Sequence, residues 1–179
     1  LRFLLERLRQ WDASNTKDVD AFATLSHFIA DRIRRNYGRE ARVIYPPVDT
    51  EFFTPGGTRG DYYLTARRLV QYKRIDLIAR AFAALPAQRL LIVGDGPDES
   101  KVRAVAGPNV TMLGRRSREE LRELLRGARA FLFAAEEDFG IAPVEAQACD
   151  TPGIAFGRVG AWEPVPGATQ PRHAGRCFG

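Results

Sequence analysis

Three short segments of this 179-residue chain combine charged side chains with glycine in patterns that suit phosphate or sugar binding. In the first, Arg68 and Lys73 place two long cations five residues apart. A guanidinium forks onto phosphate oxygens and an ammonium adds a compact charge, so the pair suits a diphosphate. A solvated basic loop is the alternative for this segment taken alone. The second segment, Gly94-Asp95-Gly96-Pro97, lacks the third glycine of a dinucleotide fingerprint, which argues against a nicotinamide cofactor.

The third segment, residues 136–143, leads into a predicted helix that bears Glu145. Glu137 and Glu145, with seven residues between them, could accept hydrogen bonds from two parts of one polyhydroxy ligand. Gly140 lets the backbone approach a ligand, and the free amides at the start of the helix, residues 139–142, can hold an anion or a sugar oxygen. As bare spacing, the two glutamates are also compatible with a solvated surface.

Several other kinds of site are not supported by the sequence. No Gly-Lys-Ser/Thr run is present, which excludes a Walker-type phosphate loop. The two cysteines, Cys149 and Cys177, are too few for a disulfide scaffold and too far apart for a zinc site. They fit a reducing compartment. We therefore expect no metal and no cofactor, and a cytoplasmic location.

The composition is that of a globular protein with a basic surface. Hydrophobic residues make up 45% and charged residues 27% of the chain, enough for one full domain or one plus a fragment. No stretch approaches the roughly 18 to 20 apolar residues that a membrane span needs. The 27 basic and 22 acidic residues give a net charge of +5, which suits nucleotides, nucleic acids and anionic lipid headgroups alike.

Two segments near the start of the chain carry apolar or basic faces. Residues 1–11 set apolar side chains at helical spacing with arginines opposite, unlike a signal peptide. We expect that face to pack against the rest of the protein, with a peripheral contact at the inner face of the membrane as the alternative. A predicted helix over residues 26–37 ends in an arginine run that complements the helix dipole. No recognition motif accompanies the run, so we expect no nucleic-acid partner. Its members are Arg32, Arg34, Arg35, Arg39 and Arg42.

From residue 61 onward, predicted strands alternate with predicted helices. Ser117 and Glu120 have the spacing of a capping box at the start of one helix, and Pro143 lies near the start of another. Several strands are apolar on both faces, which is typical of a parallel sheet covered by helices on both sides. The fold class is therefore α/β, a Rossmann-like doubly wound parallel sheet. Ligands of such sheets bind beyond the carboxyl ends of the strands, where the three segments lie. The predicted strands are residues 62–65, 89–93, 110–113, 130–134 and 153–156.

Segments spread over about residues 20–163 resemble retaining glycosyltransferases of family 4, which have the GT-B fold. Residues 137–146 look like the family's Glu-x7-Glu motif, and Arg68 with Lys73 looks like its diphosphate loop. Residues 72–76 and 137–140 are most similar to bacterial mannosyltransferases that use GDP-mannose. Further segments that resemble family landmarks are residues 43–49, 93–97, 110–114 and 148–152.

The resemblance implies a hexosyltransferase that moves a hexose, with mannose as our expectation, from a nucleoside-diphosphate sugar to a glycan or lipid-linked acceptor. The anomeric configuration would be retained and no divalent metal would be needed. GDP-mannose is the expected donor and a UDP-sugar is the alternative. The product would be a polysaccharide or a glycolipid.

The same resemblance implies roles for individual residues. Arg68 and Lys73 would bind the donor diphosphate and neutralise the leaving group, and Glu137 would contact hydroxyls of the donor sugar. Glu145 would accept hydrogen bonds from the ribose, while the segment around Gly114 would lie beside the base. The substrate-binding residues implied in this way are Glu145, Phe139, Gly140, Ile141, Gly94, Gly96, Gly114 and Arg115.

The resemblance also implies a domain organisation. Residues 1–45 would be a remnant of the N-terminal, acceptor-side domain, and residues 46–60 the interdomain linker. Residues 61–179 would be the donor-binding domain, truncated and irregular after about residue 157. The acceptor-binding half would be a missing partner of this chain.

Some residues depart from the family's pattern. Asp150 and Val159 stand where the family has glycine, at a position that needs positive φ and in a loop that approaches the sugar. Pro164 would stop a helix that the family continues. We expect the chain alone to bind nucleotide weakly and to lack transferase activity. The alternative is a non-catalytic nucleotide-binding or interaction module derived from a glycosyltransferase.

Overall fold

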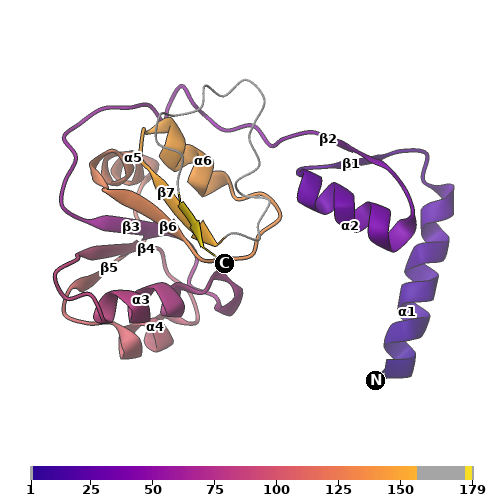
Figure 1. Cartoon of the computed structure of the whole chain (residues 1–179), viewed down its shortest axis with the longest axis horizontal. Helices are drawn as coiled ribbons and strands as arrows, with labels where there is room; N and C mark the ends of the chain where they lie inside the picture. Colours follow the sequence, from indigo (N-terminus) through magenta and orange to yellow (C-terminus); the bar gives the residue numbers. More distant parts are fainter. Residues whose placement is uncertain (1, 157–175, 179) are drawn as a thin grey trace. The chain divides into compact units, whose positions relative to one another are not determined.

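A computed structural model describes residues 2–156 and 176–178 of the chain. The chain divides into two compact units, Leu1–Pro47 and Val48–Gly179, which we call the N-terminal and the C-terminal unit (Figure 1). Each is described by itself. The assignment of the first to a remnant of an acceptor-side domain stays a prediction.

The N-terminal unit contains a two-stranded parallel sheet and two α-helices. Strand β1 pairs with strand β2, and helix α2 connects them. Ser26 caps α2 by accepting a hydrogen bond from the amide of Ile29 at 3.2 Å, and Gly38 ends it with φ 64°. Both ends of this helix were predicted from the sequence. The elements are α1 (Arg2–Asn15), the 3₁₀ turn η1 (Thr16–Asp18), β1 (Phe22–Thr24), α2 (His27–Tyr37) and β2 (Ala41–Val43).

Members of the arginine run make hydrogen bonds within this unit; Arg35, for example, donates to the carbonyl of Asp31 at 3.2 Å. Arg34 donates to Asp31 at 2.7 Å on the surface of α2. Arg39 donates to the carbonyl oxygens of Thr16 and Val19 at 2.9 and 2.8 Å, and its guanidinium lies 5.2 Å from the ring centroid of Phe22. Arg39 therefore holds the turn that precedes β1.

The apolar face of α1 is exposed among the described residues, with Phe3 at 74% and Trp11 at 65% of their full accessible area. This face is not covered within the described part of the N-terminal unit, so its packing against the rest of the protein stays a prediction. Tyr37 of α2 donates to Asp12 of α1 at 2.7 Å, but this contact covers none of the apolar side chains. No helix in the described part of the chain combines the length and apolar character needed to cross a membrane.

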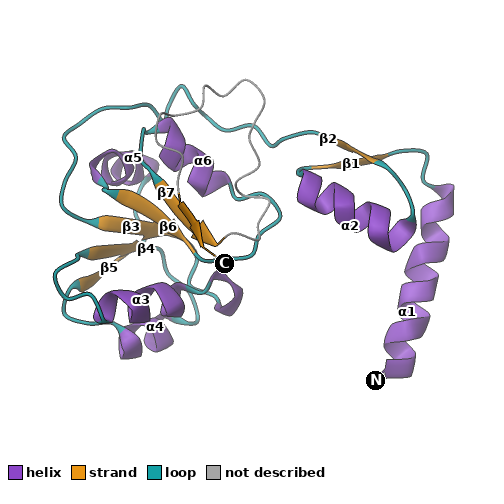
Figure 2. Ribbon diagram, viewed as in Figure 1, coloured by secondary structure: helices purple, strands orange, loops and turns teal. Residues whose placement is uncertain are grey.

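The C-terminal unit is built on a six-stranded parallel sheet with the order β5-β4-β3-β6-β7-β8 (Figure 2). Five of these strands match the predicted ones to within a residue or two, which confirms the doubly wound α/β fold. The strands are β3 (Tyr63–Ala66), β4 (Leu90–Val93), β5 (Val110–Gly114), β6 (Ala130–Phe133), β7 (Gly153–Phe156) and β8 (Arg176–Phe178).

Neighbouring side chains of a strand point to opposite sides of the sheet, so the apolar strands give it two apolar faces. Helices cover both of these faces. Leu90 and Ile92 of β4 pack in the cluster under α3 and α4. Leu91 and Val93 pack in the other cluster, under α5 and α6. Figure 1 shows these two helical layers on either side of the sheet. The helices are α3 (Ile75–Ala83), α4 (Glu99–Val105), α5 (Arg118–Gly127) and α6 (Ile141–Ala148), with a 3₁₀ turn η2 (Gln71–Lys73) before α3.

Helix α5 begins with the predicted capping box. The Ser117 hydroxyl accepts from the amide of Glu120 at 3.1 Å, and the Glu120 carboxylate accepts from the amide of Ser117 at 2.8 Å. This reciprocal pair satisfies two amides that the helix itself cannot use. The start of α5 is therefore set by local sequence.

The C-terminal end differs from the expectation that residues 153–156 form the last strand. Strand β8 pairs in parallel with β7, placing Cys177 opposite Ala155. Three residues are too few to show an apolar alternation, so the sequence pattern gives no sign of this strand. The expected irregular tail, with Val159 and Pro164, lies outside the described residues.

Asp150 follows α6 with φ 60°, which confirms that this position needs a left-handed backbone. Its carbonyl oxygen accepts a hydrogen bond from Arg59 at 2.7 Å, and this contact holds the turn before β7. A β-carbon in the left-handed region is disfavoured, less so for aspartate than for most residues.

Replacing Asp150 with glycine should raise the free energy of unfolding by about 1 kcal/mol, because glycine adopts φ 60° without steric cost. Asp150→Ala is the matched control, since it removes the same carboxylate but keeps the β-carbon, and it should lower the stability. Thermal unfolding measures both. An equal change in melting temperature for the two variants would show that the carboxylate, not the backbone, decides the effect.

Candidate functional site

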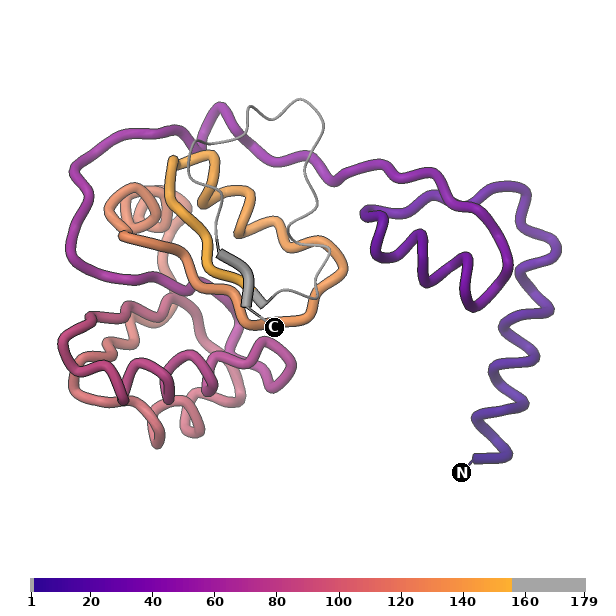
Figure 3. Tube along the Cα trace, viewed as in Figure 1, coloured from indigo at the N-terminus to yellow at the C-terminus, as the bar shows by residue number. Residues whose placement is uncertain are grey.

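The loops after β3, β4 and β6 lie at one edge of the sheet, because these strands are adjacent and parallel. Figure 3 shows the loop after β3 and the loop between β6 and α6 at the same end of the sheet. These are the three segments that the sequence singled out. Their convergence follows from the strand order β4-β3-β6.

The loops after β3 and β4 are joined through their backbones. The amide of Leu69 donates to the carbonyl of Asp95 at 2.8 Å, and the amide of Asp98 donates to the carbonyl of Leu69 at 3.0 Å. A β-carbon on Gly94 would collide with the carbonyl group of Arg67, and one on Gly96 with the carbonyl group of Leu69. The two glycines thus allow the close approach of the two loops.

Glu137, in the loop after β6, binds two cations from the loop after β3. Arg67 donates from Nη1 to Glu137 Oε2 at 2.7 Å, and the Lys73 ammonium pairs with Oε1. The side chains of Arg67, Lys73 and Glu137 are only 11%, 13% and 13% exposed. We call these three residues the ion-pair cluster. It holds two positive charges and one negative charge, so it has an excess positive charge.

Arg67 has a fixed position within the ion-pair cluster. Its guanidinium carbon lies 4.2 Å from the ring centroid of Phe133, the last residue of β6, in a cation–π contact. The Nε and Nη2 atoms of Arg67 are buried and have no hydrogen-bond partner among the described residues. The guanidinium therefore has N–H groups left over for a ligand.

Burial governs the titration of both cations. It lowers the pKa of Lys73 to about 8, and the neighbouring charge of Arg67 acts in the same direction. Burial also lowers the pKa of Arg67 to about 10, against the charge of Glu145, which raises it. An anionic ligand would reverse these effects, because it would favour both protonated forms.

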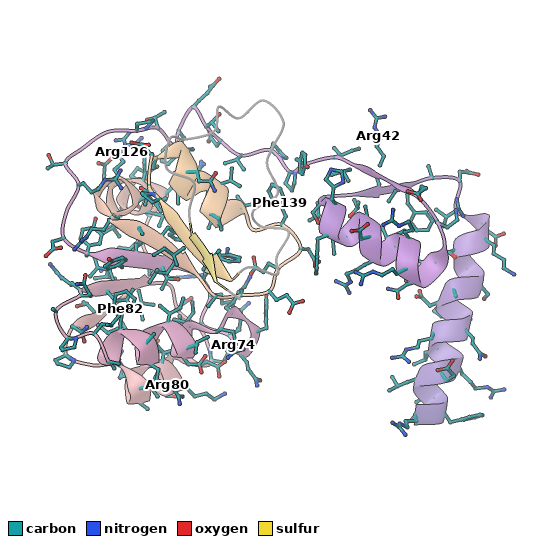
Figure 4. All side chains as sticks on the ribbon, viewed as in Figure 1. Arg42, Arg74, Arg80, Phe82, Arg126 and Phe139 are labelled. Atoms are coloured by element: carbon teal, nitrogen blue, oxygen red, sulfur yellow. The ribbon has the colours of Figure 1, made fainter. Side chains whose placement is uncertain are left out.

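Helix α6 brings a second carboxylate to the same side. Gly140, at its N-cap, has φ 84°, which reverses the chain direction before the helix. Phe139, labelled in Figure 4, is 5% exposed and Ile141 is 45% exposed. Glu145 is partly buried, which raises its pKa, while the charges of Arg118 and Arg67 lower it. Glu145 and Lys73 thus both lie near Arg67.

The segment that follows residue 47 is anchored to α5 rather than free. Arg118 donates to the Asp49 carboxylate at 2.9 Å, and its guanidinium lies 4.4 Å from the ring centroid of Phe52. Arg126, two turns further along α5, donates to the carbonyl and hydroxyl oxygens of Thr54 at 2.8 and 2.7 Å. The charge of Asp49 raises the pKa of Glu145 and that of Arg118 lowers it, so this segment belongs to the surroundings of the site.

The family model described as "Glycosyl transferases group 1" matches residues 51–164, which include all of these loops. The chain belongs to this family. A D-inositol 3-phosphate glycosyltransferase of Mycobacteroides abscessus is 34% identical over 163 residues, covering 79% of this chain and 35% of the relative. A GDP-mannose-dependent monoacylated alpha-(1-6)-phosphatidylinositol monomannoside mannosyltransferase of Corynebacterium glutamicum is 32% identical over 184 residues, covering 85% and 48%. The chain thus spans about a third to a half of these curated relatives.

Solved glycosyltransferases share the fold. Sucrose-phosphate synthase from Thermosynechococcus elongatus matches with a TM-score of 0.74 at 23% identity, over 88% of this chain and 45% of that one. Anabaena HepE, solved with UDP and glucose, matches with a TM-score of 0.66 at 20% identity, over 79% and 45%. The resemblance to GT-B glycosyltransferases of family 4 is therefore confirmed.

Within this group 1 glycosyltransferase, the structure brings some predicted residues together and leaves others apart. Lys73, Glu137 and Glu145 lie around Arg67, a residue that the sequence analysis did not select. Arg68 is exposed. Arg67 and Arg68 are neighbours in sequence, and which of them turns inward depends on how the chain leaves β3. The adjacent arginines were the only signal for Arg67, and they did not decide between the two.

The residues predicted to lie near the base, Gly114 and Arg115, are not part of the ion-pair cluster and differ from it in their surroundings. Arg115 is 84% exposed at its side chain and pairs with Asp95, from the loop after β4, at 3.3 Å. A β-carbon on Gly114 would meet open space. The loops after β4 and β5 are therefore joined by an exposed ion pair between Arg115 and Asp95.

Two further features bear on ligand binding. A pocket of about 310 Å³ lies between the loop after β3 and the starts of α3 and α4, and none of the predicted site residues lines it. Within residues 2–156 and 176–178, no group of three or more histidine, cysteine or acidic side chains is arranged to hold a metal.

Replacing Gly94 with alanine should lower the free energy of unfolding by about 3 kcal/mol or more, because its β-carbon would collide with backbone atoms of Arg67. Gly114→Ala is the matched control. Gly114 also has positive φ, but its β-carbon would meet open space, so that change should cost only about 1 kcal/mol. Urea unfolding compares the two. Similar costs for both variants would contradict the close packing of the two loops.

Proposed function

We propose that this chain is the donor-binding part of a retaining hexosyltransferase that uses a nucleoside-diphosphate sugar. The observation that supports this most directly is the ion-pair cluster, with its excess positive charge at the carboxyl ends of β3 and β6. A buried site of this kind attracts an anion, because the low local dielectric strengthens each charge–charge interaction. Membership of the glycosyltransferase family makes the diphosphate of a sugar nucleotide the fitting anion.

In this proposal two of the cationic residues after β3, Arg68 and Lys73, act on the donor diphosphate. Lys73 binds phosphate oxygens from within the site, and Arg68 binds them from the exposed rim. As the glycosidic bond breaks, negative charge accumulates on the leaving diphosphate, and these preplaced cations stabilise that charge without reorganisation. No divalent metal is required for this step in our proposal.

The acidic residues orient the rest of the donor. Glu137 accepts hydrogen bonds from hydroxyls of the hexose, next to the amides of residues 139–141, which hold the sugar and the phosphates. Glu145 accepts hydrogen bonds from the ribose hydroxyls. Gly94, Gly96, Gly114 and Arg115 border the nucleotide, and the base lies beside Gly114.

The proposed donor is GDP-mannose, with a UDP-sugar as the alternative. The Corynebacterium glutamicum relative, which is named as a GDP-mannose-dependent mannosyltransferase, supports this choice. The acceptor would be a glycan or a lipid-linked glycan, held by a part of the enzyme outside the donor-binding unit. We place the reaction in the cytoplasm, with a peripheral contact at the inner face of the membrane.

Titration of GDP, UDP and ADP into the chain tests this function. We expect GDP to bind best, and Glu145→Ala to weaken that binding about tenfold, because two charge-assisted hydrogen bonds to the ribose are lost. Glu136→Ala is the matched control, since Glu136 is an exposed carboxylate in the same acidic segment. Calorimetry at high nucleotide concentration measures all three nucleotides. Equal affinity for the two variants, or no nucleotide binding at all, would refute the proposal.

The affinity for GDP should also fall as the pH rises through about 8, the pKa of Lys73. Below that pH Lys73 is charged and attracts the diphosphate, and above it the ammonium is neutral. Bound diphosphate raises the pKa of Lys73, so the dissociation constant should rise by up to about tenfold per pH unit above 8. The Lys73→Arg variant should flatten this profile, because arginine stays charged. The same slope in both proteins would rule out Lys73 as the titrating group.

A further inference from the structure

The ion-pair cluster holds two cations that differ in how firmly they are placed. Arg67 is bound to Glu137 through Nη1, lies over the ring of Phe133 and is anchored by its own amide, which donates to the carbonyl of Val93 at 2.9 Å. Its side chain therefore has contacts on several sides. Moving it would break a buried charge-assisted hydrogen bond and a cation–π contact together.

Lys73 is placed less rigidly. It is the last residue of η2, a 3₁₀ helix of one turn, and the next residue, Arg74, has φ 54°. Its ammonium lies 4.7 Å from the ring centroid of Tyr72, a side chain that is itself 61% exposed. A lysine ammonium has no directional fork, so it exchanges one oxygen partner for another more readily than a guanidinium.

We propose that Arg67 is a positioning residue: it is the permanent counter-ion of Glu137, and it frees Lys73 to transfer from Glu137 Oε1 to the donor diphosphate. This inference rests on the proposed function. It assigns to Arg67 a role that neither its sequence neighbour Arg68 nor Lys73 performs. No covalent step is involved, because only ionic partners change.

The reason is electrostatic. A carboxylate buried beside a diphosphate would repel it, and a buried charge without a partner costs several kcal/mol. In the free protein Glu137 has two counter-ions, so it can lose one and remain neutralised. With Arg67 absent, Lys73 would have to neutralise both Glu137 and the diphosphate. Binding of the diphosphate would then compete with the pairing of Glu137.

A suppressor experiment separates this role from direct contact with the ligand. Titrating GDP alone, we expect Arg67→Met to weaken binding at least about tenfold, because Glu137 is left to repel the diphosphate and to retain Lys73. We expect Arg67→Met combined with Glu137→Gln to restore the affinity to within about threefold of Glu137→Gln alone. The neutral amide no longer needs a counter-ion, so Arg67 becomes dispensable.

The alternative outcomes are distinct. If the Nε and Nη2 atoms of Arg67 bind the diphosphate directly, Arg67→Met weakens GDP binding equally in both backgrounds, and the inference is overturned. Arg80→Met is the matched control: it removes the same charge from an exposed site on α3, labelled in Figure 4, and should change the affinity less than about twofold. Circular dichroism and thermal unfolding establish that each variant is folded.

A second measurement needs no nucleotide, so it tests the inference even where the proposed function fails. The chain has three lysines, Lys17, Lys73 and Lys101, so lysine-selective NMR can follow the Lys73 ammonium through a pH titration. The groups that face it are Arg67, Glu137 and the Tyr72 ring. Glu145 acts on Arg67 from α6.

Arg67→Met should raise the pKa of Lys73, because a neighbouring positive charge is removed and Glu137 keeps Lys73 as its one partner in the cluster. The Glu137→Gln variant should move that pKa in the opposite direction. An unchanged pKa in Arg67→Met would show that the two cations do not share Glu137, and would overturn the inference. Wild-type chain that binds no nucleoside diphosphate would refute the proposed function alone.

Discussion

The carboxylate of Glu137 joins two loops that come from different strands, and the site depends on that bridge. One oxygen takes a hydrogen bond from Arg67 and the other pairs with Lys73, so the loop after β6 is tied to the loop after β3. Bringing three charged groups out of water is costly, and their mutual attraction offsets this cost only where the geometry is accurate. The surrounding fold therefore has to hold all three side chains in place.

The scaffold meets this demand through contacts made by residues outside the ion-pair cluster. Gly94 and Gly96 let the loop after β4 lie directly against the backbone of Arg67 and Leu69 in the loop after β3. The ring of Phe133 supplies a flat surface for the guanidinium. Arg118 holds Asp49 and Phe52 against α5. The charges of Arg118 and Asp49 both shift the pKa of Glu145. Position of the charges is thus decided by packing.

Local sequence was enough to predict features whose causes are local. The capping box of Ser117 and Glu120 and the Ser26 cap each depend on a few adjacent residues, whereas the left-handed turn at Asp150 was implied by the family resemblance. The parallel sheet was predictable too, because strands such as Leu90–Val93 are apolar on both faces. From the sequence alone, these parallel strands place the three polar segments at one end of the sheet.

The misses have causes that lie outside the local sequence. Strand β8 forms by pairing with β7, and its three residues are too few to show a strand pattern in the sequence. The choice between Arg67 and Arg68 depended on a turn that is set by the neighbouring loop, which is a tertiary effect.

That last choice changes how the charge of the site is understood. A sequence view with one arginine and one lysine facing two glutamates describes a balanced site, in which each cation has an anion to satisfy. The structure exchanges Arg68 for Arg67 in that count: Arg67 and Lys73 both bind Glu137, Glu145 lies near Arg67, and Arg68 is exposed. Both cations thus share the carboxylate of Glu137, so two like charges are held together in a region of low dielectric, which costs energy in the free protein. In the proposed function, the incoming diphosphate supplies a second anion for these two cations and so relieves that cost.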